Sequence, residues 1–208
     1  MREKKIPQPT IERLPIYYRS LLEMQKEGLD RVSSEELGRR SHVSSVQIRK
    51  DLTYFGEFGK RGFGYKIKDL LQHIASILGL TATKKIAVFG AGNLGRALIR
   101  YSGFANENFK IVAAFDRDVQ KVGDKINDVM VYDCKMLDKL VAEEEIEIGI
   151  IAVPAEAAQD AADRLSEAGV TGILNFAPTK IIVSDKVKLR DVDLGIEMLR
   201  LSYHLAQH

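Results

Sequence analysis

The chain has 208 residues, of which 45% are hydrophobic and 29% charged, enough for one large or two small domains with packed cores. No stretch approaches the about 18 consecutive apolar residues of a membrane span, and residues 1–9 lack the apolar run of a signal peptide. The single cysteine, Cys134, excludes an internal disulfide and is expected to be a small buried side chain. We therefore expect a cytoplasmic protein with no membrane partner.

The net charge of +2 is divided unevenly along the chain. Residues 1–80 hold 15 Lys and Arg against 10 Asp and Glu, a net charge of +5, whereas residues 81–208 hold 16 against 19, a net charge of −3. A basic N-terminal part favours a polyanionic partner such as nucleic acid. The alternative is that this asymmetry arose by chance.

Three helices are predicted near the start of the chain. Apolar residues at helical spacing indicate a first helix over 11–25, which ends before Gly28. Serines followed by two acids are typical of the start of a second, short helix at 33–40. After a turn at 41–43, a third helix is expected over 46–54, again preceded by serines. Two short helices joined by a tight turn predict a helix-turn-helix, whose second helix reads the major groove of DNA.

The next stretch, residues 55–67, alternates four glycines with aromatic and basic residues. A helix is disfavoured there because each glycine costs about 1 kcal/mol relative to alanine, so a β-hairpin with a basic tip is expected. A helix-turn-helix followed by such a hairpin predicts a winged helix-turn-helix domain that binds double-stranded DNA. The candidate DNA contacts are Ser44, Gln47, Arg49, Lys50, Tyr54, Lys60 and Arg61. The alternative for this charged stretch is a solvated face.

A connecting helix is predicted over 68–80, and the division between domains is expected directly after it. We expect a DNA-binding domain over residues 1–80, a nucleotide-binding domain over 81–192 and a C-terminal helix over 193–208. This last helix has an apolar stripe, which packs either on its own domain or on a partner. Helix-turn-helix proteins usually bind two-fold palindromic operators as dimers, which favours a dimer-forming helix.

The second domain opens on an apolar strand, a G-x-G-x-x-G turn and the start of a helix. Gly90 permits the tight bend, Gly92 lets backbone N–H groups approach a pyrophosphate, and Gly95 lets the helix pack on the strand. A second strand over 110–115 ends in Asp116, where an acid would hydrogen-bond the adenine ribose. An acid there favours NAD over NADP, although its neighbour is an arginine. The alternative is a loop aspartate.

Further strands are expected over 130–132, 146–153 and 170–176, with helices over 134–142 and 155–168. Such alternation predicts an α/β domain of Rossmann type, with a parallel sheet covered on both faces. Ligands bind such sheets at the carboxyl ends of the strands. The candidate cofactor-binding residues are therefore Gly90, Ala91, Gly92, Asn93, Leu94, Gly95, Asp116, Arg117, Val153, Pro154, Asn175 and Phe176.

Two other functions remain open at this point, an NAD-dependent dehydrogenase and a sensor of CoA or another nucleotide. Hydride transfer needs an acid or base near the nicotinamide, and none of the four histidines falls at a strand end of the second domain. Asp116 argues against the 3′-phosphate of CoA. We therefore expect neither an enzyme nor a bound metal, but a DNA-binding sensor.

The chain resembles the Rex family of redox-sensing transcriptional repressors over essentially its whole length. The stretches that carry the resemblance are residues 33–38, 46–56, 60–65, 90–95, 115–118 and 172–178. The resemblance implies a bacterial homodimer whose C-terminal helix is swapped into the partner. It further implies that NADH favours a closed form that leaves DNA, whereas NAD+ permits or favours DNA binding, and that the regulated genes serve fermentation and anaerobic respiration.

The resemblance also implies a set of residues that reports the redox state of the cofactor. Arg19, Tyr101 and Asp193 match this set, with Asp193 supplied by the partner's swapped segment. One departure concerns Leu194, since some members carry phenylalanine there, beside the nicotinamide. A physical reason for sensing is charge: the oxidised nicotinamide is a cation, which attracts Asp193, and the reduced one is neutral. We therefore expect rotation of the two winged helices as the output.

Overall fold

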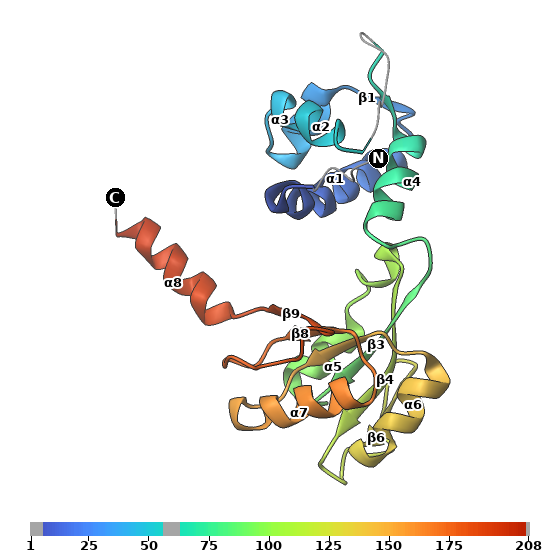
Figure 1. Cartoon of the computed structure of the whole chain (residues 1–208), viewed down its shortest axis with the longest axis vertical. Helices are drawn as coiled ribbons and strands as arrows, with labels where there is room; N and C mark the ends of the chain where they lie inside the picture. Colours follow the sequence, from blue (N-terminus) through green and yellow to red (C-terminus); the bar gives the residue numbers. More distant parts are fainter. Residues whose placement is uncertain (1–5, 56–62, 207–208) are drawn as a thin grey trace. The chain divides into compact units, whose positions relative to one another are not determined.

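A computed structural model describes residues 6–55 and 63–206 of this chain. It contains two compact units that divide between Ala82 and Thr83, and each is described by itself (Figure 1). The expected separation of a third segment at residue 193 stays a prediction. The helix-turn-helix and the Rossmann-type parallel sheet are both present, which confirms these parts of the predicted fold class. The hairpin expected over 55–67 lies largely outside the described residues, and the swapped helix stays a prediction.

The first unit is built mainly from helices. Its elements are α1 (Gln8–Lys26), β1 (Arg31–Val32), α2 (Ser34–Ser41), α3 (Ser45–Leu52), β2 (Tyr65–Lys66) and α4 (Ile67–Ile77). The core forms where one face of α1 meets the other helices, because Leu14, Leu21, Leu37, Ile48 and Ile74 are all almost completely buried. The four predicted helices are confirmed, with ends that differ by a few residues.

α2 and α3 form the predicted helix-turn-helix. The side chains of Ser33 and Ser44 each accept a backbone N–H from the first turn of the helix that they cap, at 3.0 and 3.2 Å. Between the helices, His42 adopts the left-handed conformation with φ 54°. A Cβ on Gly38 would lie 2.5 Å from the carbonyl oxygen of Val43, so only glycine lets the turn approach α2 this closely.

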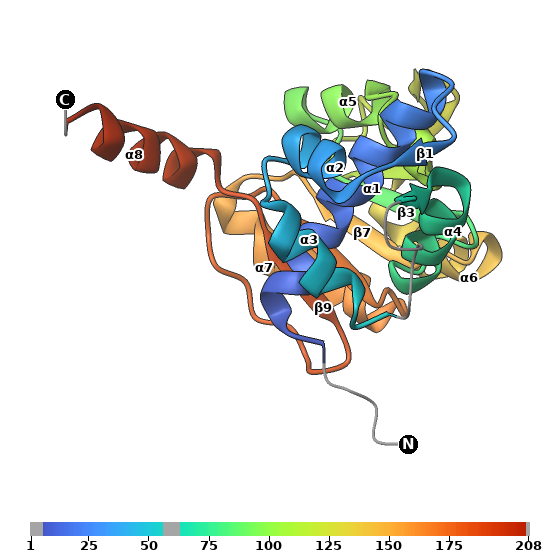
Figure 2. The same cartoon turned by 90° about the horizontal axis from the view of Figure 1, so that it is seen from above.

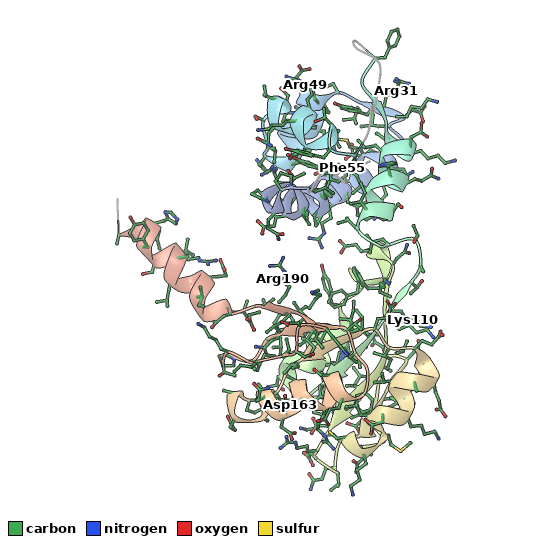
Figure 3. The ribbon with its side chains drawn as sticks, viewed as in Figure 1. Arg31, Arg49, Phe55, Lys110, Asp163 and Arg190 are labelled. Atoms are coloured by element: carbon green, nitrogen blue, oxygen red, sulfur yellow. The ribbon has the colours of Figure 1, made fainter. Side chains whose placement is uncertain are left out.

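The short strand β2 pairs with a segment far away in sequence. β2 is antiparallel to β1, which precedes the helix-turn-helix. β1 was not predicted from the sequence, because two residues show no periodicity. Arg31 Nε donates to the carbonyl oxygen of Phe63 at 2.8 Å, which holds the returning chain beside β1 (Figure 3). The predicted basic tip, with Lys60 and Arg61, lies outside the described residues.

The second unit is a seven-stranded sheet with helices on both faces. Its elements are β3 (Lys84–Phe89), α5 (Asn93–Arg100), η1 (Ala105–Glu107), β4 (Phe109–Asp116), β5 (Lys125–Ile126), β6 (Val129–Asp133), η2 (Cys134–Met136), α6 (Leu137–Glu144), β7 (Ile148–Ile151), α7 (Ala155–Glu167), β8 (Gly172–Asn175), β9 (Lys188–Asp191) and α8 (Leu194–Leu205). The sheet order is β5-β6-β4-β3-β7-β8-β9, and every described pairing except β5 with β6 is parallel. The six parallel strands have the 3-2-1-4-5-6 order of the Rossmann fold. The short strands β5 and β9 were not predicted from the sequence.

Side chains of β3 alternate between two hydrophobic cores. Ala87 and Phe89 pack with α6 and α7 on one face, whereas Ile86 and Val88 pack with Ile99 of α5 on the other. A strand that is covered on both faces is a continuous run of apolar residues, so these strands could be predicted from the sequence. The carboxyl ends of β3, β4 and β7 consequently meet at one edge of the sheet.

The C-terminal helix α8 has no buried residue. Figures 1 and 2 both show it extending away from the sheet of its own unit. Its predicted stripe of Leu194, Met198, Leu201 and Leu205 has exposed fractions of 63, 65, 51 and 70%. An apolar stripe with this exposure is typical of an interaction site. The swapped arrangement itself stays a prediction.

Cys134 is buried, as expected, and its burial raises the pKa of the thiol. Across residues 6–55 and 63–206, no helix combines the length and the apolar character that a membrane span requires. Within the same residues, no group of three or more His, Cys, Asp or Glu is arranged to hold a metal ion.

Candidate cofactor-binding and DNA-binding sites

Glycine occupies three positions of the turn after β3, and two of them are required by the fold itself. Gly90 has φ +105°, and a Cβ there would lie 2.5 Å from the carbonyl oxygen of Ala152. On Gly95 a Cβ would lie 1.9 Å from the carbonyl oxygen of Gly90, so α5 packs on β3 only without a side chain. On Gly92 a Cβ would meet no atom within 4 Å. This middle glycine faces open space, as it must where a pyrophosphate approaches the backbone.

α5 begins directly after this turn, and its N-cap residue Gly92 brings no side chain to the N–H groups of the first helical turn. Such a helix N-terminus binds anions. Arg96 holds the turn in place, because its guanidinium donates to the carbonyl oxygen of Ala91 at 3.2 Å and pairs with Asp124 at 2.5 Å. Arg96 was not predicted from the sequence, since nothing local links it to an acid 28 residues away.

Asp116 ends β4 and turns its carboxylate towards the glycine turn. Its Oδ2 accepts the backbone N–H of Ala91 at 2.8 Å and the ammonium of Lys121 at 3.1 Å, and its Oδ1 accepts the N–H of Asp118 at 2.9 Å. Burial alone would raise the pKa of this carboxyl, but the donors outweigh burial and the pKa is lowered. An ionised acid at this strand end can hydrogen-bond ribose hydroxyls and repels a phosphate on them.

A cleft of about 530 Å³ opens at the carboxyl ends of β3, β4 and β7. Six predicted cofactor residues line it: Gly90, Gly92, Asp116, Arg117, Val153 and Pro154. Of the other predicted residues of the turn, Ala91 is buried, and Asn93 and Leu94 are exposed in the first turn of α5. Arg117 pairs with Asp160 of α7 at 2.5 Å. A cleft of this size with a few converging polar groups suits a nucleotide.

Asn175 and Phe176 do not line this cleft. Asn175 is fully buried, and its amide donates to Asp191 Oδ1 at 2.8 Å and to the carbonyl oxygen of Thr179 at 3.0 Å. Its own oxygen accepts the N–H of Ala177 at 2.9 Å, so the side chain shapes the turn between β8 and β9. Phe176 is partly buried and packs against the hydrophobic core that contains Ile99 of α5. Direct contact of these two residues with a cofactor stays a prediction.

The structure places the three predicted switch residues on different elements. Arg19 is exposed on α1 of the first unit. Tyr101 caps the end of α5, is 52% exposed and meets Phe104 edge to face, with ring centroids 5.2 Å apart. Asp193 is the N-cap of α8, where Oδ1 accepts the N–H groups of Gly195 and Ile196 at 2.8 and 3.1 Å. Their joint action stays a prediction.

The exposed face of α3 carries the described part of the predicted DNA interface. Arg49 and Lys50 are exposed, and Arg49 donates to Ser34 Oγ at 2.7 Å (Figure 3). Ser44 is exposed at the helix N-cap, and Tyr54 is half-buried just beyond its end. Of the seven predicted DNA contacts, five are therefore described, and their contact with DNA stays a prediction.

The buried side of α3 contains a charged cluster that the sequence analysis missed. Asp51 is fully buried, and Arg13 of α1 donates to both its oxygens, at 2.7 and 2.9 Å. Tyr17 and Thr10 of α1 add hydroxyl donors at 2.7 and 3.0 Å. Gln47, a predicted DNA contact, donates its amide to the same carboxylate at 2.8 Å. The Asp51 cluster therefore fixes α3 against α1.

Acid is expected to destabilise the first unit through Asp51. Burial would raise its pKa, but Arg13, Tyr17, Gln47 and Thr10 together lower it to about 2, from 3.8. A lowered folded-state pKa means that the stabilisation is complete above pH 3.8 and is lost as the pH falls towards 2. We expect a loss of roughly 2 kcal/mol over this interval. Unfolding of the wild type and of Asp51→Asn between pH 5 and about 2 measures it, and equal pH slopes would contradict it.

Together the two units define a class of protein, in which a helix-turn-helix DNA-binding unit precedes a dinucleotide-binding unit. Two family models match the same parts of the chain: "Putative DNA-binding protein N-terminus" matches residues 5–53, and "CoA binding domain" matches residues 81–179. The chain is 50% identical over 205 residues to the redox-sensing transcriptional repressor Rex of Carboxydothermus hydrogenoformans, with 99% of each chain covered. It therefore belongs to the Rex family of redox-sensing transcriptional repressors.

Other relatives agree over the full length. The Rex repressor of Pelotomaculum thermopropionicum is 47% identical over 207 residues, covering 100% of this chain and 97% of the relative. The structure is similar to that of RSP in complex with β-NAD+ and operator DNA, with TM-score 0.90, 39% identity and coverage of 97% of this chain and 93% of that one. Its TM-score to RSP in complex with β-NADH is 0.85, at 37% identity and with 98% and 96% of the chains covered.

Proposed function

We propose that this protein is a homodimeric transcriptional repressor that binds an operator through its first unit and senses the ratio of NADH to NAD+ through its second. The single observation that carries the proposal is the site itself: a glycine turn, a helix N-terminus and an ionised Asp116 around one cleft, joined to a helix-turn-helix. The dimer that holds NADH is closed and leaves the operator, so genes of fermentation and respiration are derepressed. The protein acts in the cytoplasm.

The residues of the second unit fit NAD(H) in their chemistry. The open side of Gly92 and the first turn of α5 provide N–H groups for the pyrophosphate, and Asp116 provides an acceptor for the adenine ribose. Bound NAD(H) supplies a nicotinamide whose charge differs between its two redox states. The ion pair of Arg117 with Asp160 leaves this arginine less available to a ribose phosphate. The site therefore favours NAD(H) over NADP(H).

The protein acts as a regulator and not as an enzyme, since relatives that match it over the whole length are named transcriptional repressors. The alternative of a CoA sensor draws on the family description "CoA binding domain" for residues 81–179. The full-length relatives favour redox sensing instead. A CoA molecule would also bring its 3′-phosphate towards the Asp116 carboxylate, which disfavours it.

The test is a titration of the full-length protein with a palindromic operator duplex at fixed salt, across ratios of NADH to NAD+. We expect NADH to weaken operator binding at least tenfold, which corresponds to a difference of about 1.4 kcal/mol in the binding free energy of the operator. At the same concentration, NADPH, CoA and ATP should leave operator binding unchanged. Release by CoA but not by NADH would establish the alternative. An absence of operator binding under every condition would contradict the proposal as a whole.

The redox switch predicts a charge-dependent role for Asp193. Asp193→Asn keeps a good N-cap for α8 but removes the negative charge. We expect this variant to bind NADH and operator while NADH no longer releases the operator, because the response depends on attraction between Asp193 and the cationic NAD+ ring. The operator titration with NADH, repeated on the variant, measures the loss. Asp193→Ser, which also caps, serves as a second neutral variant; release by NADH in both variants, equal to wild type, would refute the switch.

The exposed stripe of α8 predicts the dimer contact. The double variant Met198→Glu/Leu201→Glu is expected to be monomeric at concentrations where the wild type is a dimer, because it places two charges in an apolar contact. Analytical ultracentrifugation measures the mass. His204→Glu is the control, since it adds a charge outside the stripe and should leave the dimer intact. A dimer in all three proteins would exclude the stripe as the contact.

A further inference from the structure

The exposed face of α3 contains one apolar side chain among its charged and polar ones. Val46, Arg49, Lys50 and Thr53 are exposed, whereas Ile48 and Leu52 point into the core. Arg49 and Lys50 lie three and four positions after Val46, and Thr53 lies four and three positions after them, so helical geometry places all four in a single stripe. Val46 is 66% exposed and lies near the helix N-terminus, the end that contacts base edges in helix-turn-helix proteins.

Contacts on the buried side of α3 fix the orientation of the helix about its own axis. Arg13 and Tyr17 of α1 bind Asp51 on the buried side of α3, which holds the opposite side, with Val46, towards solvent. The same carboxylate draws the amide of Gln47 along the helix surface, at 2.8 Å. Gln47 is half-buried as a result, so the polar neighbour that the sequence favoured for base contacts is turned towards Asp51.

The stability of α3 does not explain why valine occupies position 46. Valine is a weaker helix former than alanine, and a single exposed apolar residue is by itself ordinary. The position of Val46 distinguishes it, because it continues the stripe of two cations suited to phosphates or base edges. A small branched apolar group in such a stripe matches one feature of the major groove, the C5-methyl group of thymine.

We propose that Val46 is a specificity-determining residue that contacts the C5-methyl group of a thymine in each half-site of the operator, and that Gln47 supports α3 through Asp51. This inference rests on the proposed DNA binding by α3. The contact removes both the Val46 side chain and the thymine methyl group from water. Deoxyuridine at that position, which lacks only the methyl group, therefore weakens binding without changing any hydrogen-bonding group of the base pair.

The experiment is a double-mutant cycle between protein and DNA. The full-length wild type first selects its preferred duplex from a random pool, and each thymine is then replaced by deoxyuridine, symmetrically in both half-sites. For the wild type we expect one thymine whose replacement weakens binding about fourfold per half-site, equivalent to ~0.8 kcal/mol for one methyl group. Val46→Ala should bind the thymine duplex more weakly by a similar factor, and should show no further loss with deoxyuridine at that position.

Val119→Ala is the matched control, a valine of the second unit that is 75% exposed, and it should behave as the wild type throughout. Asp51→Asn, tested with the same duplexes, should reduce discrimination between the selected and random duplexes, because α3 is no longer held. Equal affinity of Val46→Ala and wild type, or equal losses in both at every thymine, would overturn the assignment of Val46. Failure of the wild type to prefer any duplex over random DNA would instead contradict the proposed function.

Discussion

Replacing Asp51 with alanine is expected to destabilise the first unit by about 3–5 kcal/mol, because Arg13 would keep a partly buried charge with no partner. Asp51 is fully buried, and Tyr17 would lose its acceptor as well. A loss of this size is a large part of the stability of a small domain, so operator binding should fail. Hydrogen exchange of amides in α1 and α3 of the full-length protein measures the destabilisation.

Two variants make this result specific to the Asp51 cluster. Asp69→Ala removes an exposed acid from the first turn of α4 and should leave exchange in α1 and α3 unchanged. The double variant Arg13→Met/Asp51→Leu removes both charges and should recover much of the stability, since an apolar pair often replaces a buried ion pair without loss. Exchange in Asp51→Ala equal to that of the wild type would show that the cluster contributes little.

Substituting the glycines of the turn after β3 is expected to separate binding from folding. A Cβ on Gly92 meets no atom of the protein, so Gly92→Ala should fold normally but weaken NADH binding about tenfold or more by occupying the space that phosphates need. A Cβ on Gly95 would lie 1.9 Å from the carbonyl oxygen of Gly90. Gly95→Ala should therefore destabilise the second unit by about 1–3 kcal/mol and also bind NADH poorly.

Calorimetric titration with NADH and thermal unfolding measure the two effects. Both variants should remain on the operator when NADH is added, because the cofactor is no longer bound. Gly172→Ala is the control, since its Cβ would meet the nearest atom at 3.6 Å, an ordinary contact. Unchanged NADH affinity in Gly92→Ala would exclude the turn as the phosphate site, whatever the stability of Gly95→Ala.

Local signals explain which elements the sequence predicted correctly. Ser33 and Ser44 cap α2 and α3 by bonds to residues three positions away, so the helix starts could be recognised without any tertiary information. The strands β3, β4 and β7 are covered on both faces and therefore show as apolar runs. β1, β5 and β9 were missed because two or four residues, mostly exposed, carry no such pattern.

The candidate sites divide in the same way. The glycine turn and Asp116 follow a spacing that reflects one local unit of strand, turn and helix, and the cleft brings them together as predicted. Asn175 was assigned from its place at a strand end, but its side chain is used to shape the turn before β9, a strand that the sequence did not reveal. Gln47 donates its amide to Asp51, whose burial against α1 the sequence did not reveal, and contact of Gln47 with DNA stays a prediction.

The sequence by itself determined the helix-turn-helix, the parallel sheet with its glycine turn and the family, because caps, glycines and apolar periodicity act within a few residues of one another. Only the tertiary structure decided that Asp51 is a buried anchor for α3, since its partners Arg13 and Thr10 are 38 and 41 residues away in the chain. Only the tertiary structure also showed that Arg96 holds the glycine turn through Asp124. A charged side chain looks the same in a sequence whether it faces solvent or a buried partner, and burial depends on which distant segments the fold brings together.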